Sequence, residues 1–550
     1  MGKKFWARRR EHQTIRSPGC LRTHRMGDHG TRSVAADRVL GIAVGPAAGG
    51  LGLAAGHLLA ALMSPSASPV LAVGSAVIDR TPTPMKEWAI AQFGTHDKDI
   101  LVGSVFAVVL ILASAIGLLA RARPRPAGLP AGLALCGLGA AAAACALTRP
   151  EATVLDLLPS VVAIAVAWPT LWFLTRPGPA AARLVLTGHP DPSLGSITAR
   201  RRTVVIATSV VTAAALALGQ TGRWLLGARS RPEDIVLPAP ASPAPGFPRG
   251  LDQMVPKITP FRTANKSFYR VDTRLDVPIV DSASWRLSID GDVQRPFTVD
   301  FADLLAMPLI ERDITLTCVS NSVGGPYVGG ARWLGVRLTD LLDRAGVGSG
   351  ADQILSTDVD GMTISTPLAL AADGRDAMVA IGMNGQALPR AHGFPARLVI
   401  PGLYGFISAT KWVTRLTLTT YAERSAYWTD RDWATDAPIK ISSRIDTPRP
   451  LQDIASGEVV IGGVAWAQAQ GGVATVEVRI DGGPWQRATL GPSAGNDYWR
   501  QWFFRWSATP GTHQLSTRVV DGNNGKQTPA RAAPFPSGAS GLHSISVSVS

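Results

Sequence analysis

The stretch Ile314–Gly325 has the sequence ITLTCVSNSVGG, in which one cysteine, Cys318, separates a strand-like run from a glycine-containing turn. A side chain at the end of a strand, followed by a loop, lies where folds commonly place ligands and chemistry. Cys318 is also the only cysteine beyond residue 145. It is either a small buried hydrophobic residue or a metal-binding or reactive thiol. The surrounding sequence has to distinguish these two alternatives.

A second distinctive block lies downstream, at Met383–Arg397 (MNGQALPRAHGFPAR) and Ala409–Trp412 (ATKW). Arginine, lysine and histidine close to glycine turns suit an anionic ligand, because charge is combined with close backbone approach. The alternative is a charged surface loop beside a core strand. That alternative is adequate for Arg390 but less so for Arg397 and Lys411, which adjoin apolar strands and need a partner if they are buried.

The first part of the chain has the pattern of a membrane domain. Positive charges are concentrated in segments 1–38, 121–126 and 176–202, which together account for the whole formal net charge of +14. This distribution excludes a basic patch on a folded domain, and with it a nucleic-acid-binding function. It predicts a cytoplasmic N-terminus and an extracytoplasmic second half. Five apolar runs are long enough to cross about 30 Å of hydrocarbon: residues 39–63, 100–120, 127–147, 153–175 and 203–227.

Two features of the membrane part need separate interpretation. The apolar stretch Val70–Ile78 is too short to span a membrane, and the helix-like segment Lys86–Phe93 after it is expected at the outer interface. Arg201 and Arg202 directly precede the fifth run. Paired arginines at this place fit a twin-arginine export signal, and they fit an ordinary cytoplasmic anchor equally well.

Beyond residue 227 the composition predicts three further units and a tail. A proline-rich linker, 228–261, is expected to be extended. Mixed short strands and helices over 262–440 indicate an α+β domain. Strands separated by DGG and DGN turns over 441–535 indicate an Ig-like β-sandwich, followed by a C-terminal tail, 536–550.

Several common chemistries find no support in the sequence. It contains no GxGxxG after a strand, no phosphate-binding P-loop, no CxxC and no GxSxG nucleophile elbow at a strand-to-helix turn. A Cys318–His392 nucleophilic pair lacks an identifiable third group, and His57 with His96 is a weak candidate for haem ligation against a structural role. The histidines outside the apolar runs and the basic segments have no metal-ligand spacing: His96, His392, His513 and His543.

Residues from about 262 to 532 resemble the sulfite oxidase family of molybdopterin enzymes. The Cys318 strand, the MNGxxLPxxHGFPxR block at Met383–Arg397, the TKW block at Thr410–Trp412 and the Ig-like region occur in the family's order. With five apolar runs ahead of it, the chain is similar to a membrane-anchored actinobacterial member, related to the periplasmic methionine sulfoxide reductase catalytic subunit. The expected fold is therefore a five-helix membrane domain, an α+β molybdopterin domain and an Ig-like β-sandwich.

The resemblance implies oxygen-atom transfer with Mo-molybdopterin as cofactor and Cys318 as the metal ligand. It implies a small-molecule substrate, a separate quinone-linked or haem electron partner, because no haem domain is fused to the chain, and a homodimer formed through the Ig-like region. Arg270 and Arg500 match cations of the sulfite site, and Arg270 also lies in the cofactor segment. The other positions that match cofactor-binding residues are Tyr269, His392, Arg397, Ala409, Thr410 and Lys411.

Three positions depart from the family's pattern. Val323 occupies the place of an arginine five residues after the cysteine. Trp433, five residues after Trp428, replaces the active-site tyrosine, and Asp272 replaces a histidine. Loss of a cation and a phenol weakens an anion pocket, so the expected substrate is not sulfite, and S-oxide or N-oxide reduction becomes a candidate activity. The rival interpretation is a cofactor-free envelope module that serves in binding or assembly.

Overall fold

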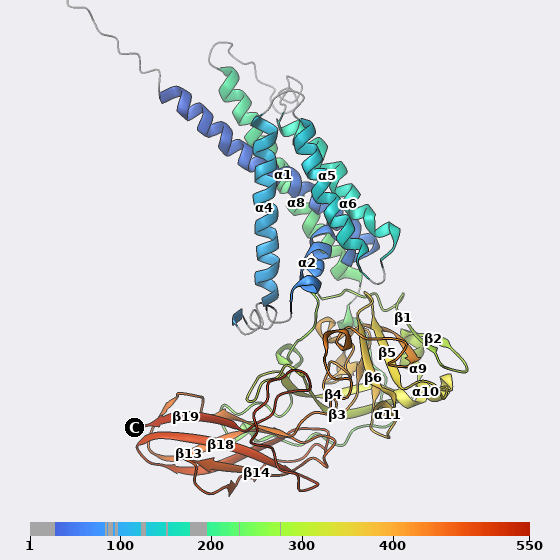
Figure 1. Cartoon of the computed structure of the whole chain (residues 1–550), viewed down its shortest axis with the longest axis vertical. Helices are drawn as coiled ribbons and strands as arrows, with labels where there is room; N and C mark the ends of the chain where they lie inside the picture. The colour runs from blue at the N-terminus through green and yellow to red at the C-terminus, as the bar shows by residue number, and fades with distance from the viewer. Residues whose placement is uncertain are drawn as a thin grey trace, which may run out of the picture.

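The computed structural model describes residues 28–82, 85, 92–93, 97–122, 128–149, 152–175, 195–229, 231–275 and 277–550. A bundle of long helices forms one end of the molecule, and two β-rich parts form the other (Figure 1). Most of the expected basic tail lies outside the described residues. So do most of the segment Lys86–Phe93, much of the two arginine-rich connections, and His96.

Among the described residues, five helices are long and apolar enough to cross a membrane, as predicted. Close backbone approach between α1 and α4 comes from glycine, since a Cβ on Gly45 would lie 1.8 Å from Ala113 O. The candidate spans within these helices are Gly41–Met63, Gly103–Ala120, Leu129–Leu147, Val154–Thr175 and Arg202–Gly222. The helices are α1 (Asp28–Met63), α4 (Asp97–Ala122), α5 (Gly128–Leu147), α6 (Leu158–Thr175) and α8 (Gly195–Arg229).

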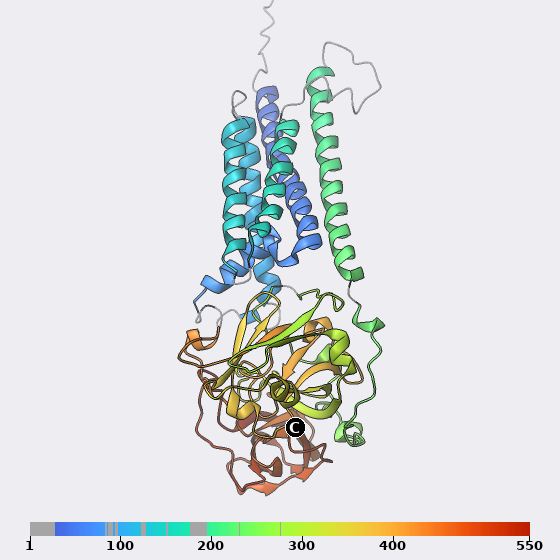
Figure 2. The same ribbon diagram turned by 90° about the vertical axis from the view of Figure 1, so that its right-hand side faces the viewer.

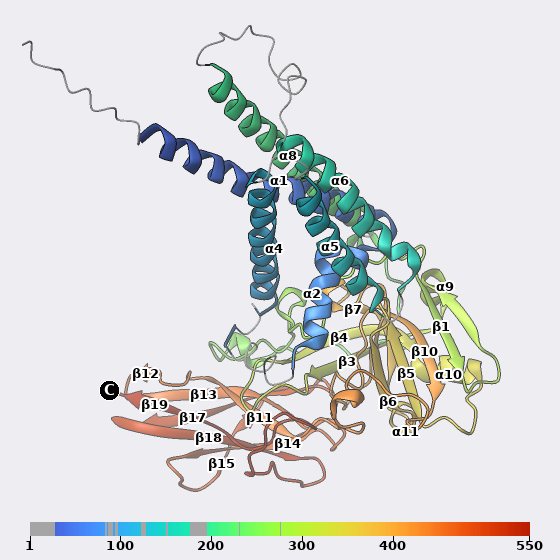
Figure 3. The same ribbon diagram turned by 45° about the horizontal axis from the view of Figure 1, so that its top comes forward.

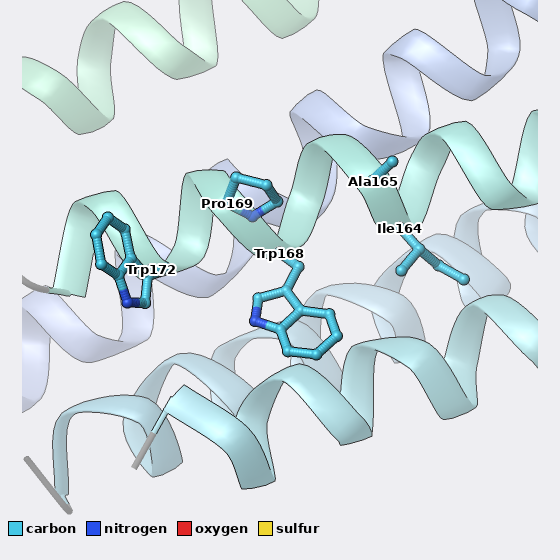
Figure 4. Close-up of a pocket in the computed structure, with 5 residues that line it drawn as sticks. All are labelled: Ile164, Ala165, Trp168, Pro169 and Trp172. Carbon is cyan, nitrogen blue, oxygen red and sulfur yellow. The ribbon is translucent and has the colours of Figure 1, made fainter. Parts of the chain in front are cut away.

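The apolar stretch Val70–Ile78, predicted to be too short to span a membrane, lies within α2 (Pro69–Arg80), which is preceded by the turn η1 (Pro65–Ala67). Figures 1 and 3 place α2 between the other helices and the sheets. A Cβ on Gly74 of α2 would lie 2.3 Å from Leu275 Cδ1, so the helix packs directly on the second half of the chain. A shallow apolar hollow on α6, lined by Trp168 and Trp172 among others, belongs to a candidate span (Figure 4).

The central part, which follows the linker, contains two five-stranded sheets around one apolar core. Its α+β character was predicted, and Figure 2 shows it below the helices. The first sheet has the order β2-β1-β10-β5-β6: β1 (Arg286–Gly291), β2 (Phe297–Asp300), β5 (Gln353–Asp358), β6 (Thr363–Pro367) and β10 (Val413–Thr419). Three helices accompany the sheets: α9 (Phe301–Ala306), α10 (Leu338–Ala345) and α11 (Leu368–Ala371).

The second sheet carries the cysteine strand and has the order β3-β4-β7-β8, with β9 paired to β7. Thr317, the last residue of β3, lies opposite Val328 of the antiparallel strand β4. Beside them, Gly329 and Gly330 leave room for large rings, because a Cβ on either would lie within 3.0 Å of Phe268 or Tyr498 atoms. The strands are β3 (Leu309–Thr317), β4 (Val328–Arg337), β7 (Met378–Met383), β8 (Gln386–Ala387) and β9 (Arg397–Val399).

The C-terminal part consists of two sheets that enclose a single apolar cluster, so its predicted all-β character is confirmed. The cluster includes Ile461 and Trp502 from one sheet and Val476 and Leu515 from the other. The first sheet contains β11 (Ser442–Thr447), β13 (Gly457–Trp466), β17 (Arg500–Ala508) and β16 (Thr489–Leu490). The second contains β12 (Asp453–Ile454), β19 (His543–Val549), β18 (Gly511–Asp521), β14 (Val473–Ile480) and β15 (Gln486–Arg487).

The end of the chain differs from the expectation of a tail over 536–550. Residues His543–Val549 form β19, which lies between β12 and β18 in the second sheet. Ile545, Val547 and Val549 alternate with serines, and these three side chains are buried. A strand with this alternation buries one face and exposes the other, so it completes the apolar cluster.

The C-terminal part is hydrogen-bonded to the cysteine strand itself. Thr315 of β3 donates its N–H to Asp497 O at 2.9 Å, and its hydroxyl accepts from Trp499 N at 3.0 Å. Its carbonyl accepts from Gln468 Nε2 at 2.6 Å. The strand that ends at Cys318 is therefore held by residues that follow it by 150 positions or more.

Candidate functional site

Cys318 lies directly after β3, as the sequence predicted, and its N–H donates to Tyr327 O at 3.0 Å. The residue is 8% exposed, and its Sγ lies 2.9 Å from Ser320 Oγ. Burial raises the pKa of the Cys318 thiol, while the hydrogen bond with Ser320 and the charge of Lys411 oppose this shift. The free thiol is therefore protonated at neutral pH, and it has to lose its proton to bind a metal.

The turn after Cys318 is fixed from two directions. Within it, Asn321 Oδ1 accepts from Tyr327 N at 2.9 Å. From the C-terminal part, Arg444 Nη1 donates to Gly325 O at 2.8 Å. Gly324 has φ +79°, and a Cβ there would lie 2.3 Å from His543 Nε2, so only glycine fits between this turn and β19.

Arg397, at the start of β9, carries a buried guanidinium. It is 5% exposed, and it donates to the carbonyls of Leu398, His392 and Ala409 at 3.1–3.3 Å. Within the described residues, no carboxylate forms an ion pair with it. Burial lowers the pKa of Arg397 to about 10, and the nearby Tyr269 opposes the shift. A buried cation without a counter-charge is costly unless an anion binds beside it.

Lys411 and Arg270 share one carboxylate. Asp272 Oδ2 lies 2.6 Å from Lys411 Nζ and 2.7 Å from Arg270 Nε. Burial lowers the pKa of Lys411 to about 8, with Asp272 opposing the shift. The positive charges of Arg270 and Arg397 also lower the pKa of Lys411, so the three cations lie close together.

His392 lies in the turn η7 (Arg390–His392), is 5% exposed, and its Nε2 donates to Asn265 O at 2.8 Å. Burial lowers the pKa of His392 to about 4, and the charges of Arg397, Lys411 and Arg270 add to the lowering. The imidazole is therefore neutral at pH 7. Because Nε2 carries the proton, Nδ1 remains an acceptor.

Aromatic side chains lie around the thiol. Burial raises the pKa of Tyr269 and that of Tyr404, the latter to about 12, and the charge of Cys318 adds to both shifts. Tyr269 stacks on Phe268 at 5.2 Å and lies 6.4 Å from Tyr327, both measured between ring centroids. The phenols are thus protonated and enclose the cysteine in a largely apolar setting.

The comparisons with known proteins bear on this arrangement. Residues 274–428 match the family model described as "Oxidoreductase molybdopterin binding domain". Human mitochondrial sulfite oxidase is 32% identical over 311 residues, covering 48% of this chain and 56% of that protein. Chicken sulfite oxidase is 28% identical over 324 residues, covering 50% of this chain and 70% of that protein. Over about half of its length, the chain is thus similar to sulfite oxidases.

The chain spans about half the length of several sulfite oxidases that it matches. Among solved structures, the sulfane dehydrogenase SoxCD from Paracoccus pantotrophus is similar with a TM-score of 0.44 and 24% identity. That match covers 50% of this chain and 78% of the SoxCD chain. Residues 274–428 are therefore identified as a domain for molybdopterin.

The residues present fit the cofactor of the sulfite oxidase family. Arg397 offers an uncompensated buried charge to a phosphate, and Cys318 offers a soft sulfur ligand. Gly393, at φ +110°, keeps the space between Arg397 and Lys411 open, because a Cβ there would lie 3.0–3.2 Å from both. Among the described residues, no three His, Cys, Asp or Glu side chains group as metal ligands, so the pterin has to supply the other ligands.

Three of the predicted site residues make contacts of another kind than Arg270, Arg397 and Lys411. Ala409 takes part through its carbonyl, and the Thr410 hydroxyl is buried against Ser356 Oγ at 2.6 Å. Arg500, at the start of β17, donates to Gly491 O at 2.7 and 3.2 Å. Among the described residues, no hydrogen bond or ion pair links Arg500 directly to Cys318.

Sequence reasoning missed several residues that shape the site. Asp272 was noted only as a departure from the sulfite oxidase family, although it pairs with two cations. Tyr404, Arg444 and His543 were not assigned to the site. The alternation of apolar residues after His543 is the signal that predicts a strand there, but no local pattern predicts that its histidine faces the cysteine turn.

Proposed function

We propose that the chain is a membrane-anchored molybdopterin oxidoreductase that catalyses oxygen-atom transfer at a molybdenum centre ligated by Cys318. The observation that carries the proposal is the buried, uncompensated Arg397 close to Tyr269 and Cys318, which suits the phosphate of a cofactor. The bound cofactor supplies the metal at which the oxygen atom and two electrons are exchanged. The balanced half-reaction is XO + 2 e⁻ + 2 H⁺ → X + H₂O, where XO is the oxygen donor.

The side chains divide into three roles in this proposal. Cys318 binds the metal as a thiolate after losing its proton. Arg397 and Lys411, with Ala409 and Thr410, hold the pterin phosphate, while the neutral His392 hydrogen-bonds the pterin and Tyr269 shields the site from water. Arg270 and Arg500 orient the substrate oxygen, and unchanged kinetics in both Arg270→Ala and Arg500→Ala would remove them from that role.

The membrane arrangement is also proposed. Segment 1–38 is a cytoplasmic tail, 39–227 a membrane domain, 228–261 a linker and 262–440 the cofactor domain. Residues 441–550, with β19 included, form an Ig-like domain. The five apolar helices support this arrangement. A twin-arginine signal at Arg201 and Arg202 would export the folded second half. If lysines at both positions leave export of that half normal, the signal is refuted.

The substrate and partners follow from the departures at the site. Val323 and Trp433 replace a cation and a phenol of the family's pattern, which supports a substrate other than sulfite, such as an S-oxide or N-oxide. Electrons are exchanged with a separate quinone-linked or haem partner, and the Ig-like domain forms a homodimer.

The decisive experiment is analysis of the purified full chain for molybdenum and pterin. Stoichiometric amounts of both, followed by turnover in a screen of S-oxides, N-oxides and sulfite, support the proposal. Absence of both would refute it and leave the cofactor-free envelope module. Light scattering of the detergent-solubilised chain tests the dimer.

A further inference from the structure

The inference concerns the charge of the substrate and rests on the proposed function. Three cations, Arg270, Arg397 and Lys411, act on one another around the predicted cofactor site. Asp272 is the carboxylate within this group, and it contacts Arg270 and Lys411 at 2.7 and 2.6 Å. The cluster of these four residues therefore carries two net positive charges.

The neighbouring cation does not add to this charge. Arg274 forms ion pairs with both Asp358 and Asp360. Asp358 also accepts backbone N–H groups of Asp360 and Met362 at 2.9 and 3.0 Å. Burial raises the pKa of Asp358, and the charge of Arg274 and the hydrogen bond from Met362 oppose this shift. Arg274 is thus compensated by its own two carboxylate partners.

The two net positive charges of this cluster are about equal in size to the charge of the cofactor's phosphate alone. A phosphate monoester carries about −1.5 to −2 charges at pH 7. Arg397, which has no carboxylate partner within the described residues, and Lys411 are the groups proposed to hold that phosphate. Once the phosphate is bound, the cluster keeps essentially no positive charge with which to attract an anionic substrate.

The groups at the cysteine turn do not supply that charge either, because Arg444, which donates to Gly325 O, forms an ion pair with Asp446. Val323, in the cysteine turn, is apolar. Tyr269 and Tyr404 are protonated phenols, and His392 is neutral at pH 7. Arg270 keeps hydrogen-bonding capacity, but its charge is balanced by the two contacts with Asp272, at 2.7 and 3.2 Å.

We propose that Asp272 is a specificity-determining residue, which balances Arg270 and thereby selects an uncharged oxygen donor of the sulfoxide or amine N-oxide class over a dianion such as sulfite. Arg270 then acts as a hydrogen-bond donor to the substrate oxygen without a net charge. For a dialkyl sulfoxide the reaction is R₂SO + 2 e⁻ + 2 H⁺ → R₂S + H₂O, with the electrons supplied by a one-electron dye or a quinol.

The test compares the molybdenum-loaded full chain with its Asp272→Asn variant. Asp376→Asn is the matched control, because Asp376 also pairs with two arginines of the same domain, Arg312 and Arg337. Calorimetry with sulfate, an unreactive dianion, measures anion binding. Turnover is measured with dimethyl sulfoxide and reduced methyl viologen, and with sulfite and ferricyanide, at equal molybdenum content.

The parent is expected to reduce dimethyl sulfoxide with a higher kcat/KM than it oxidises sulfite, and to bind sulfate only weakly. Asp272→Asn should bind sulfate on the order of a hundredfold more tightly, the effect of removing one charge about 10 Å from a dianion at an effective dielectric constant of about 20. The same substitution should shift the kcat/KM ratio toward sulfite by a similar factor. Adding Arg270→Gln to Asp272→Asn should abolish the gain. Asp376→Asn should match the parent.

Sulfate binding by the parent as tight as by Asp272→Asn, or a parent kcat/KM for sulfite equal to that for dimethyl sulfoxide, would overturn the proposal. The parent's own sulfate affinity decides the matter if Asp272→Asn fails to retain cofactor. Failure of the proposed function has a different signature, because the parent would then contain no molybdenum or pterin.

Discussion

His543 makes the stability of the C-terminal part sensitive to acid. Its Nδ1 accepts a hydrogen bond from Ile445 N at 2.9 Å, which requires a neutral ring, and its Nε2 faces Gly324 in the cysteine turn. Burial lowers the pKa of His543 to about 4, and the charge of Arg444 adds to the lowering. Protonation of this ring therefore favours the unfolded state, where the pKa is about 6.5.

The expected loss of stability follows from the two pKa values. Above pH 6.5 the histidine is neutral in both states and the stabilisation is complete. As the pH falls from 6.5 towards 4, the unfolded state binds the proton first, and stability declines. By pH 5 the loss reaches about 2 kcal/mol relative to pH 7.5. His543→Asn removes this contribution, since the amide does not titrate in this range.

The assay is scanning calorimetry of the detergent-solubilised full chain between pH 7.5 and 5. The transition of the parent should fall more steeply with pH than that of His543→Asn. His513→Asn is the matched control, because the hydrogen bond with Asp481 raises the pKa of His513, so its stabilisation is present at low pH and is lost as the pH rises. Identical pH dependence in the parent and His543→Asn would refute the argument.

Three further predictions concern the cofactor site and its supports. Arg397→Met should change the free energy of unfolding of the cofactor-free chain by less than about 2 kcal/mol, because relief of a buried charge offsets the lost hydrogen bonds. Metal analysis of the same variant should nevertheless show no retained molybdenum. Cys318→Ser should retain pterin but lose one sulfur from the metal's coordination shell in X-ray absorption, and an unchanged sulfur count would contradict ligation. Trp499→Phe and Tyr498→Phe should each lower the free energy of unfolding, measured with denaturant, by about 1 kcal/mol, because the remaining ring still donates to Phe261 O. The double variant should lose more than the sum of the two single losses.

The sequence predicted those features that depend on local patterns. Apolar length identified the five long helices, and the strand ending at Cys318 was evident from its own residues and the turn after it. The prediction that Arg397 and Lys411 need partners if buried is confirmed for Lys411, which pairs with Asp272. Arg397 instead donates to carbonyls and within the described residues has no carboxylate.

The features that the sequence did not predict depend on contacts between distant segments. Arg500 donates to Gly491 O, and this contact depends on the path of the loop before β17, which no local motif specifies. Asp272 and Lys411 are 139 residues apart, so their pairing is invisible without the fold. The strand β19 was missed because the proline- and glycine-rich stretch before it resembles the start of a tail.

The hydrogen bonds of Thr315 have a consequence for the order of assembly. The hydroxyl of this residue, three positions before Cys318, accepts from a backbone amide 184 residues later. Until residues 468–499 have been synthesised and folded, Thr315 lacks these partners for its N–H, carbonyl and hydroxyl groups, although β3 can already pair with β4. The cysteine strand therefore reaches its final form only late in synthesis, and a chain truncated before the last domain would present an incompletely supported thiol to any cofactor-loading machinery.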